Sequence, residues 1–202
     1  MTNFIYKNDL PTDLVFGTSV AIDTETMGLN IDRDRLCLIQ LSFGDGNAHL
    51  VQLTDGNFNA PNLKKLLSDE SILKLFHFGR FDIAMIYKHL GVLCKNVYCT
   101  KIASKIVRTN TDRHGLKELC RVLLEVDLNK EQQTSDWGSD NYSAEQINYA
   151  ANDVLYLHRL REKLNILAVR EGRADLVKGC CDFLPFRAKL DVAGFIDDVF
   201  AH

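Results

Sequence analysis

Four carboxylates of this 202-residue sequence stand inside or beside apolar runs, where an ionised acid is costly unless something pairs with it. They are Asp23 and Glu25 in the segment 21–26, Asp82 after a second apolar run, and Asp153 in a third. A pair of divalent metal ions is a common partner for four acids. The residue types therefore predict a two-metal phosphodiesterase.

The local patterns allow these acids to meet. Asp23 and Glu25 are two residues apart on an expected strand, so both side chains point to one face. Asp82 opens an expected helix, and Tyr149 and Asp153 are neighbours on one helical face because they are four residues apart. Strand ends are also where α/β proteins usually place their sites. Three distant segments can therefore converge on one site.

The chemistry fits such a site. Hydrolysis of a phosphodiester needs a nucleophilic hydroxide and stabilisation of the departing alkoxide, and two Mg²⁺ or Mn²⁺ ions roughly 4 Å apart supply both. Each residue alone has a plainer interpretation: Asp82 as a helix N-terminal acid, Tyr149 as a half-buried core residue, and Asp153 as an exposed helical acid. The order, spacing and setting of the whole set favour the metal site.

The elements that must position these residues are expected from apolar patterning. The expected strands cover 20–23, 36–43, 49–53, 72–78 and a short stretch near 93–97. The first three form a meander. The expected helices cover 62–68, 81–90, 100–107, 115–124 and one long helix from Ser143 to about Arg170, which Ser143 and Gln146 can open as a capping box. This order predicts an α/β fold, a mixed central sheet flanked by helices.

The bulk properties are those of one globular domain. The sequence is 46% hydrophobic and 25% charged, and its apolar runs are too short to span a membrane. Its first residues do not follow the order of a signal peptide, so a cytoplasmic protein is expected. Six cysteines without a CxxC pair or zinc spacing predict reduced thiols and no structural zinc.

The charge pattern bears on nucleic acid binding. The net charge is −3, but the stretch from Lys95 to Arg121 carries seven basic and two acidic side chains. A solvated helical face is the plainer interpretation of this stretch. Beside a metal site, the same stretch could form a wall that faces phosphates.

The C-terminal segment differs from the rest. We expect one catalytic domain over residues 1–170 and a helical tail over 171–202, which Pro185 interrupts. The tail carries many apolar residues and is too short for a separate domain. It must dock on the core or on another subunit, and we expect it to mediate self-association.

Three ordered motifs make the chain similar to a known superfamily. These are Asp23-Thr24-Glu25, the segment from His77 to Asp82, and the segment from Tyr149 to Leu157. The chain resembles the DEDD exonucleases, in the tyrosine-bearing branch that includes ribonuclease D. The resemblance covers about 15–167 and implies a ribonuclease H-like three-layer fold.

Further features refine this resemblance. The segment 130–137 resembles one that ribonuclease D relatives carry before the third motif, whereas Phe78 replaces a residue that is often polar in relatives. The size and the tail resemble the nanoRNase C family of compact bacterial exonucleases, which degrade very short RNAs. That resemblance implies a homo-oligomer, an octameric ring, with short single-stranded RNA as its substrate.

The resemblance also implies roles for the residues of the site. Asp23, Glu25 and Asp153 would hold the first ion, Asp23 would bridge to the second, and Asp82 would lie nearby or act through water. Tyr149 would orient the attacking water. Its phenol is a poor base at a pKa near 10, so the metal would perform most of the deprotonation.

Six further residues are candidate substrate contacts. They are Thr26, Met27, Gly28, Leu29, His77 and Trp137. The segment 26–29 could let the backbone approach the terminal sugar and wedge an apolar side chain against a base. For Leu29, a turn-packing role is the alternative. For His77 it is a satisfied strand-end histidine, and for Trp137 it is core packing.

The leading hypothesis is a metal-dependent 3′–5′ exoribonuclease that acts on short RNA. Its rivals are a proofreading exonuclease of DNA, a ribonuclease D-like enzyme that trims longer RNA, an inactive nucleic-acid-binding module and a purely structural subunit. Substrate length, preference for RNA over DNA and the number of subunits do not follow from the sequence.

Overall fold

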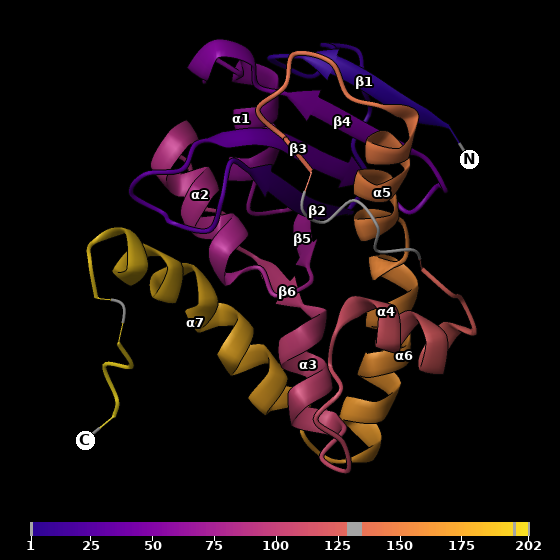
Figure 1. The fold of residues 1–202 in the computed structure, drawn as a ribbon. Helices are drawn as coiled ribbons and strands as arrows, with labels where there is room; N and C mark the ends of the chain where they lie inside the picture. The colour runs from indigo at the N-terminus through magenta and orange to yellow at the C-terminus, as the bar shows by residue number, and fades with distance from the viewer. Residues whose placement is uncertain (1, 129–134, 196, 202) are drawn as a thin grey trace.

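The computed structural model describes residues 2–128, 135–195 and 197–201. Within these ranges, six strands form one mixed sheet in the order β1-β4-β3-β2-β5-β6 (Figure 1). They are β1 (Asn3–Lys7), β2 (Ser19–Thr26), β3 (Leu36–Ser42), β4 (Ala48–Gln52), β5 (Leu73–Phe76) and β6 (Val97–Cys99). The expected α/β class, a mixed sheet flanked by helices, is confirmed.

The centre of the sheet is the expected meander. Strand β3 pairs antiparallel with both β2 and β4, while β1 pairs parallel with β4, and β5 pairs parallel with β2. All seven residues of β3 are buried, because its apolar run is covered on both faces. This buried strand lies next to β2, the strand that carries Asp23 and Glu25.

Helices cover both faces of the sheet (Figure 1). They are α1 (Pro61–Ser68), α2 (Arg80–Leu90), α3 (Thr100–Val107), α4 (Leu116–Leu119) with a π-helical turn (Cys120–Leu124), α5 (Ala144–Leu155), α6 (Leu157–Arg170) and α7 (Ala174–Val192). Helix α5 packs on β2, β3 and β4. The side chain of Thr24 points to the opposite face and contacts α2, so three layers result.

One strand was missed, and one expected helix is divided in two. Strand β1 was not foreseen, because it is a short edge strand that is stabilised by its pairing with β4. The expected long helix from Ser143 to Arg170 is two helices that meet at Tyr156. Helix α5 packs on the sheet and α6 packs mainly on α3, and apolar periodicity cannot show such a change of direction.

Pro185 does not interrupt the C-terminal helix, contrary to expectation. Helix α7 runs through it, although a proline inside a helix costs about 3 kcal/mol. Cys181 and Leu184 before the proline and Ala188 after it are buried, so packing on both sides offsets this cost.

The C-terminal helix is anchored to its own chain. It packs on α2, α3 and β6, and Arg80 of α2 donates two hydrogen bonds of 2.6 Å to Asp191. Arg187 donates a third, also of 2.6 Å, to the same carboxylate. Burial would raise the pKa of Asp191, but the two guanidinium groups outweigh it and lower this pKa. The charges of this cluster are compensated internally.

Two further expectations concern the whole chain. All six cysteines are free thiols, and five of them are buried. In the described part of the chain, no helix combines the length and the apolar character that crossing a membrane requires.

Candidate active site

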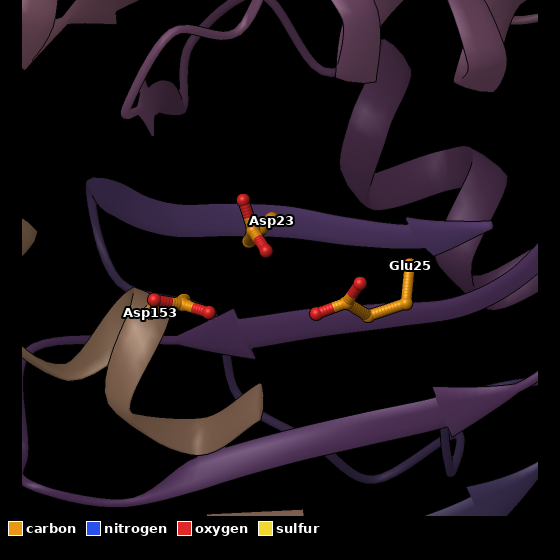
Figure 2. Close-up of side chains that lie close together, drawn as sticks. All are labelled: Asp23, Glu25 and Asp153. Carbon is orange, nitrogen blue, oxygen red and sulfur yellow. The ribbon is translucent and has the colours of Figure 1, made fainter. Parts of the chain in front are cut away.

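Strand β2 presents the first two carboxylates. Asp23 and Glu25 alternate with Thr24, so both lie on the face that α5 covers. Asp153 of α5 approaches them from across this layer, and Figure 2 shows the three carboxylates gathered over the strands. One oxygen from each lies within 4.8 Å of the others. The sequence prediction that these segments converge is confirmed for these three acids.

Helix α5 positions Asp153 and Tyr149. Its start is fixed by the expected capping box, in which Gln146 N–H donates to Ser143 Oγ and Ser143 N–H donates to the Gln146 side chain. Burial raises the pKa of the Tyr149 phenol, and the nearby carboxylate of Asp153 raises it further. Tyr149 is therefore a neutral hydroxyl beside the acids and a donor for an oxygen ligand.

Asp82 belongs to α2 rather than to β2 or α5. It lies in the first turn of α2, is buried, and accepts a 2.6 Å hydrogen bond from Thr24 Oγ1. It is outside the group of three acids but acts on them, because its charge is the strongest of those that raise the pKa of Asp23. The middle residue of the Asp-Thr-Glu motif thus fixes the fourth acid.

The electrostatics of the cluster favour a cation. Burial raises the pKa of Asp23 well above its ordinary value, and it raises that of Glu25 to about 9 and that of Asp82 to about 6. The neighbouring acids add to the first two shifts. Crowded carboxylates without a counter-charge are driven to hold protons, and a bound cation reverses this effect.

The donor set indicates which metals fit. The three clustered groups offer only carboxylate oxygens, and Asp82 adds a fourth carboxylate nearby. Oxygen-only sites suit hard ions such as Mg²⁺ and Mn²⁺ rather than zinc. The residues present therefore fit a divalent metal site.

The segment after β2 is a rigid turn with exposed apolar tips. Met27 is 59% exposed and Leu29 is 84% exposed. Thr26 Oγ1 donates to the Gly28 carbonyl at 2.5 Å, and a Cβ on Gly28 would lie 2.3 Å from Asp34 Oδ2. Asp34 fills the space beside the Cα of Gly28, so position 28 favours glycine. The turn leaves the side chains of Met27 and Leu29 in solvent.

His77 follows directly after β5. Its Nδ1 is 2.9 Å from Thr100 Oγ1, and this hydroxyl also lies 3.2 Å from the Phe76 carbonyl. This bond supports the alternative of a satisfied strand-end histidine and leaves a substrate contact through Nε2 as a proposal.

Trp137 is a packing residue in this structure. It is 3% exposed, and its ring lies 6.2 Å from that of Tyr149 and 5.5 Å from that of Tyr142. Its burial next to these two rings favours the packing alternative over base stacking. Residues 130–134 of the segment that resembles ribonuclease D lie outside the described residues.

The basic stretch is partly neutralised. Lys95 pairs with Glu70, and Arg121 pairs with Glu118. The ammonium of Lys101 lies 3.5 Å from the ring centre of Phe78. For several of these residues, the plainer interpretation of a solvated helical face is sufficient.

Sequence reasoning missed two polar residues of the site region. Thr24 is inside the first motif and was passed over, although it fixes Asp82. Gln40 is the polar residue in the middle of the apolar run of β3 and is fully buried. The sequence could have indicated Gln40, because a polar residue inside a buried apolar run requires an explanation.

Comparison with known proteins places this geometry in a family. A family model described as 3′–5′ exonuclease matches residues 5–167. The chain therefore belongs to the 3′–5′ exonuclease family, a class of phosphodiester hydrolases. Its fold is ribonuclease H-like, and the predicted resemblance to the tyrosine-bearing DEDD branch is confirmed.

Individual relatives agree. A structure of Brucella melitensis NrnC (nanoRNase C) bound to pGG is 52% identical, covers all of this chain and 99% of its own, and superposes with a TM-score of 0.96. Another structure of that protein, with bound Mg²⁺, is 51% identical. Ribonuclease D of Sphingobium indicum is 31% identical, and DNA polymerase I of Aquifex aeolicus is 34% identical. The alignments span 77% and 75% of this chain, but only 40% and 25% of those two proteins.

Proposed function

We propose that this chain is a metal-dependent 3′–5′ exoribonuclease that hydrolyses short RNA, down to dinucleotides, to nucleoside 5′-monophosphates. The observation that carries the proposal is the group of Asp23, Glu25 and Asp153, whose oxygens lie within 4.8 Å of one another. Retention of this group together with Asp82 and Tyr149 argues against an inactive binding module.

The proposed roles are those that the resemblance to the family implies, and the grouping of three of the acids supports them. Asp23, Glu25 and Asp153 would hold one ion, and Asp23 would share a second with Asp82. Two Mg²⁺ or Mn²⁺ ions would supply the hydroxide and stabilise the departing alkoxide. Tyr149 would orient the attacking water through its hydroxyl. Leu29 and Met27 would wedge the terminal base, while the tight turn at Gly28 lets the backbone approach the sugar.

Two observations favour a short substrate. The net charge is −3, and several basic residues of 95–121 are engaged within the chain, so few phosphates can be neutralised. A relative that is 52% identical is known in complex with pGG. Extra nucleotides should therefore add little affinity.

Self-association is part of the proposal, with a ring-like octamer as the form that the resemblance implies. Apolar side chains are exposed along α6 and α7, namely Ile166, Val169, Leu176, Phe183 and Phe186. Because α7 also has a buried face, deleting it would open the core, so single substitutions are the better test. We expect Phe186→Glu to reduce the particle mass in light scattering, while Lys189→Glu on the same helix does not. An unchanged mass for Phe186→Glu would show that this surface is not a subunit interface.

The experiment for the activity is a competition in one tube. A labelled dinucleotide and a single strand of about twenty nucleotides are mixed with the enzyme at physiological salt with Mg²⁺, and then with a chelator. We expect kcat/KM to favour the dinucleotide by roughly tenfold, about 1.4 kcal/mol, and the chelator to stop both reactions.

The other outcomes identify the rivals. Preferential loss of the long RNA would indicate ribonuclease D-like trimming, and equal loss of a matched DNA strand would indicate a proofreading-type exonuclease. Binding without cleavage would indicate an inactive module. The free thiols fit a reducing compartment, and we place the protein in the cytoplasm.

A further inference from the structure

Gln40 is an unusual residue in the middle of β3. It is completely buried, and within the described residues neither its side-chain nitrogen nor its side-chain oxygen has a hydrogen-bond partner. Burying an amide without partners costs roughly 1–3 kcal/mol by protein mutational data. A native protein that retains such a group usually has a use for it or lacks a partner that binds later.

The sheet register places this amide beside the candidate metal site. Gln40 stands directly opposite Asp23 in the antiparallel β2–β3 pair, and Leu38 stands opposite Glu25. Directly opposed residues share a face, with Cβ atoms about 4.5–5.5 Å apart. Gln40 therefore lies on the same face of the sheet as Asp23 and Glu25, in the strand next to theirs.

The same face of the sheet shows that an amide can be satisfied there. Gln52 of β4 lies opposite Leu38 and is 5% exposed. Its Nε2 donates to the carbonyls of Ser139 and Asp140, at 3.0 and 3.1 Å. The lack of hydrogen-bond partners therefore distinguishes Gln40, opposite Asp23, from Gln52 on the same face.

We propose that Gln40 is a positioning residue, which donates a side-chain N–H to a carboxylate oxygen of Asp23 when Asp23 ligates a divalent cation. The inference rests on the proposed function, because it needs a metal site. A carboxylate that ligates a metal has further lone pairs, and a second donor commonly fixes its orientation. The bond would use one of the N–H donors of Gln40, which have no partner within the described residues.

The residue type suits this task. A lysine opposite Asp23 would compete with the cation for the carboxylates, and an acid would add to their repulsion. A buried glutamine offers two N–H donors and no charge. Its side chain is one methylene longer than that of asparagine, so the two amides would meet Asp23 at different positions.

The test compares Gln40→Met with Gln52→Met by two measurements. One is unfolding in a chelator, and the other is the dissociation constant of Mn²⁺ by calorimetry. For Gln40→Met, which conserves the shape, we expect equal or higher stability without metal and Mn²⁺ binding that is 10- to 100-fold weaker. For Gln52→Met we expect lower stability without metal and unchanged Mn²⁺ binding. Gln40→Asn, which keeps an amide, should also weaken Mn²⁺ binding and covers the case in which Gln40→Met does not fold.

Each remaining outcome decides the question. Wild-type Mn²⁺ affinity in a folded Gln40→Met or Gln40→Asn variant would overturn the positioning role. Loss of stability without metal, with unchanged affinity, would make Gln40 a structural residue. If the wild-type protein itself binds no Mn²⁺, the proposed function fails, and that result is distinguishable from failure of the role of Gln40.

Discussion

Two acidic sites in this molecule, one at α7 and one at β2, differ in how their charge is compensated. At α7, Asp191 accepts hydrogen bonds from Arg80 and Arg187, and its pKa is lowered. At β2, Asp23 and Glu25 face Asp153, and the pKa values of both are raised.

The difference shows how a structural cluster can be told from a functional one. In the cluster of Asp191, the acid is paired with two cations and joins α7 to α2. In the cluster of Asp23, the acids face one another without a cationic side chain in the group, so their like charges repel. A bound cation would offset this repulsion.

The strongest test of this comparison is Asp23→Asn. We expect turnover to fall by at least about 10³-fold, about 4 kcal/mol of transition-state stabilisation, because a shared metal ligand is lost. The stability in a chelator should stay the same or rise, because one repelling charge is removed. The measurements are dinucleotide hydrolysis and thermal unfolding. Near-wild-type turnover in a folded variant would refute the metal assignment.

Tyr149→Phe also tests the cluster of Asp23. The variant removes one hydroxyl beside the acids and no charge. We expect kcat to fall by roughly 10²-fold with little change in KM, because the hydroxyl positions water rather than holding the substrate. Steady-state kinetics on a dinucleotide measure both constants. If KM alone changed, Tyr149 would be a substrate contact.

Asp191→Asn tests the compensated cluster. It leaves two arginines without their acid, and we expect a loss of about 2 kcal/mol in the free energy of unfolding, since Arg80 is partly exposed to solvent. This corresponds to roughly 6 °C in Tm. Mn²⁺ binding should be unchanged. Asp182→Asn is the matched control, because Asp182 belongs to an exposed pair on the same helix and should have almost no effect.

Asp23→Asn and Asp191→Asn together form one experiment. The Asp23 variant should lose metal binding and keep its stability, whereas the Asp191 variant should do the reverse. If both variants lost stability, the contrast between the clusters would be wrong.

Gly28→Ala should have the smallest effect. Its Cβ would meet Asp34, which Arg33 and the Asn30 amide hold in place, so the turn must shift. We expect KM for a dinucleotide to rise about fivefold, about 1 kcal/mol, with the fold intact. Gly115→Ala is the control, because a Cβ there meets nothing within 4 Å. An unchanged KM for Gly28→Ala would show that the turn does not contribute to substrate binding.

The sequence alone determined the composition of the site. The Asp-x-Glu spacing on a strand and the spacing of Tyr149 and Asp153 on a helix fix which side chains share a face, because these periodicities are properties of the backbone. The meander of β2, β3 and β4 followed from short apolar runs that turn signals separate. For the same reason, most helices and strands were located to within a few residues.

Other features were decided by the tertiary structure, because they depend on contacts between segments far apart in the chain. Nothing local shows that Thr24 holds Asp82, that Arg80 and Arg187 share Asp191, or that α5 and α6 diverge at Tyr156. The position of Gln40 opposite Asp23 depends on the pairing register of two strands. A sequence displays residue types and local periods, whereas compensation of charge and satisfaction of buried polar groups are settled only when the layers pack together.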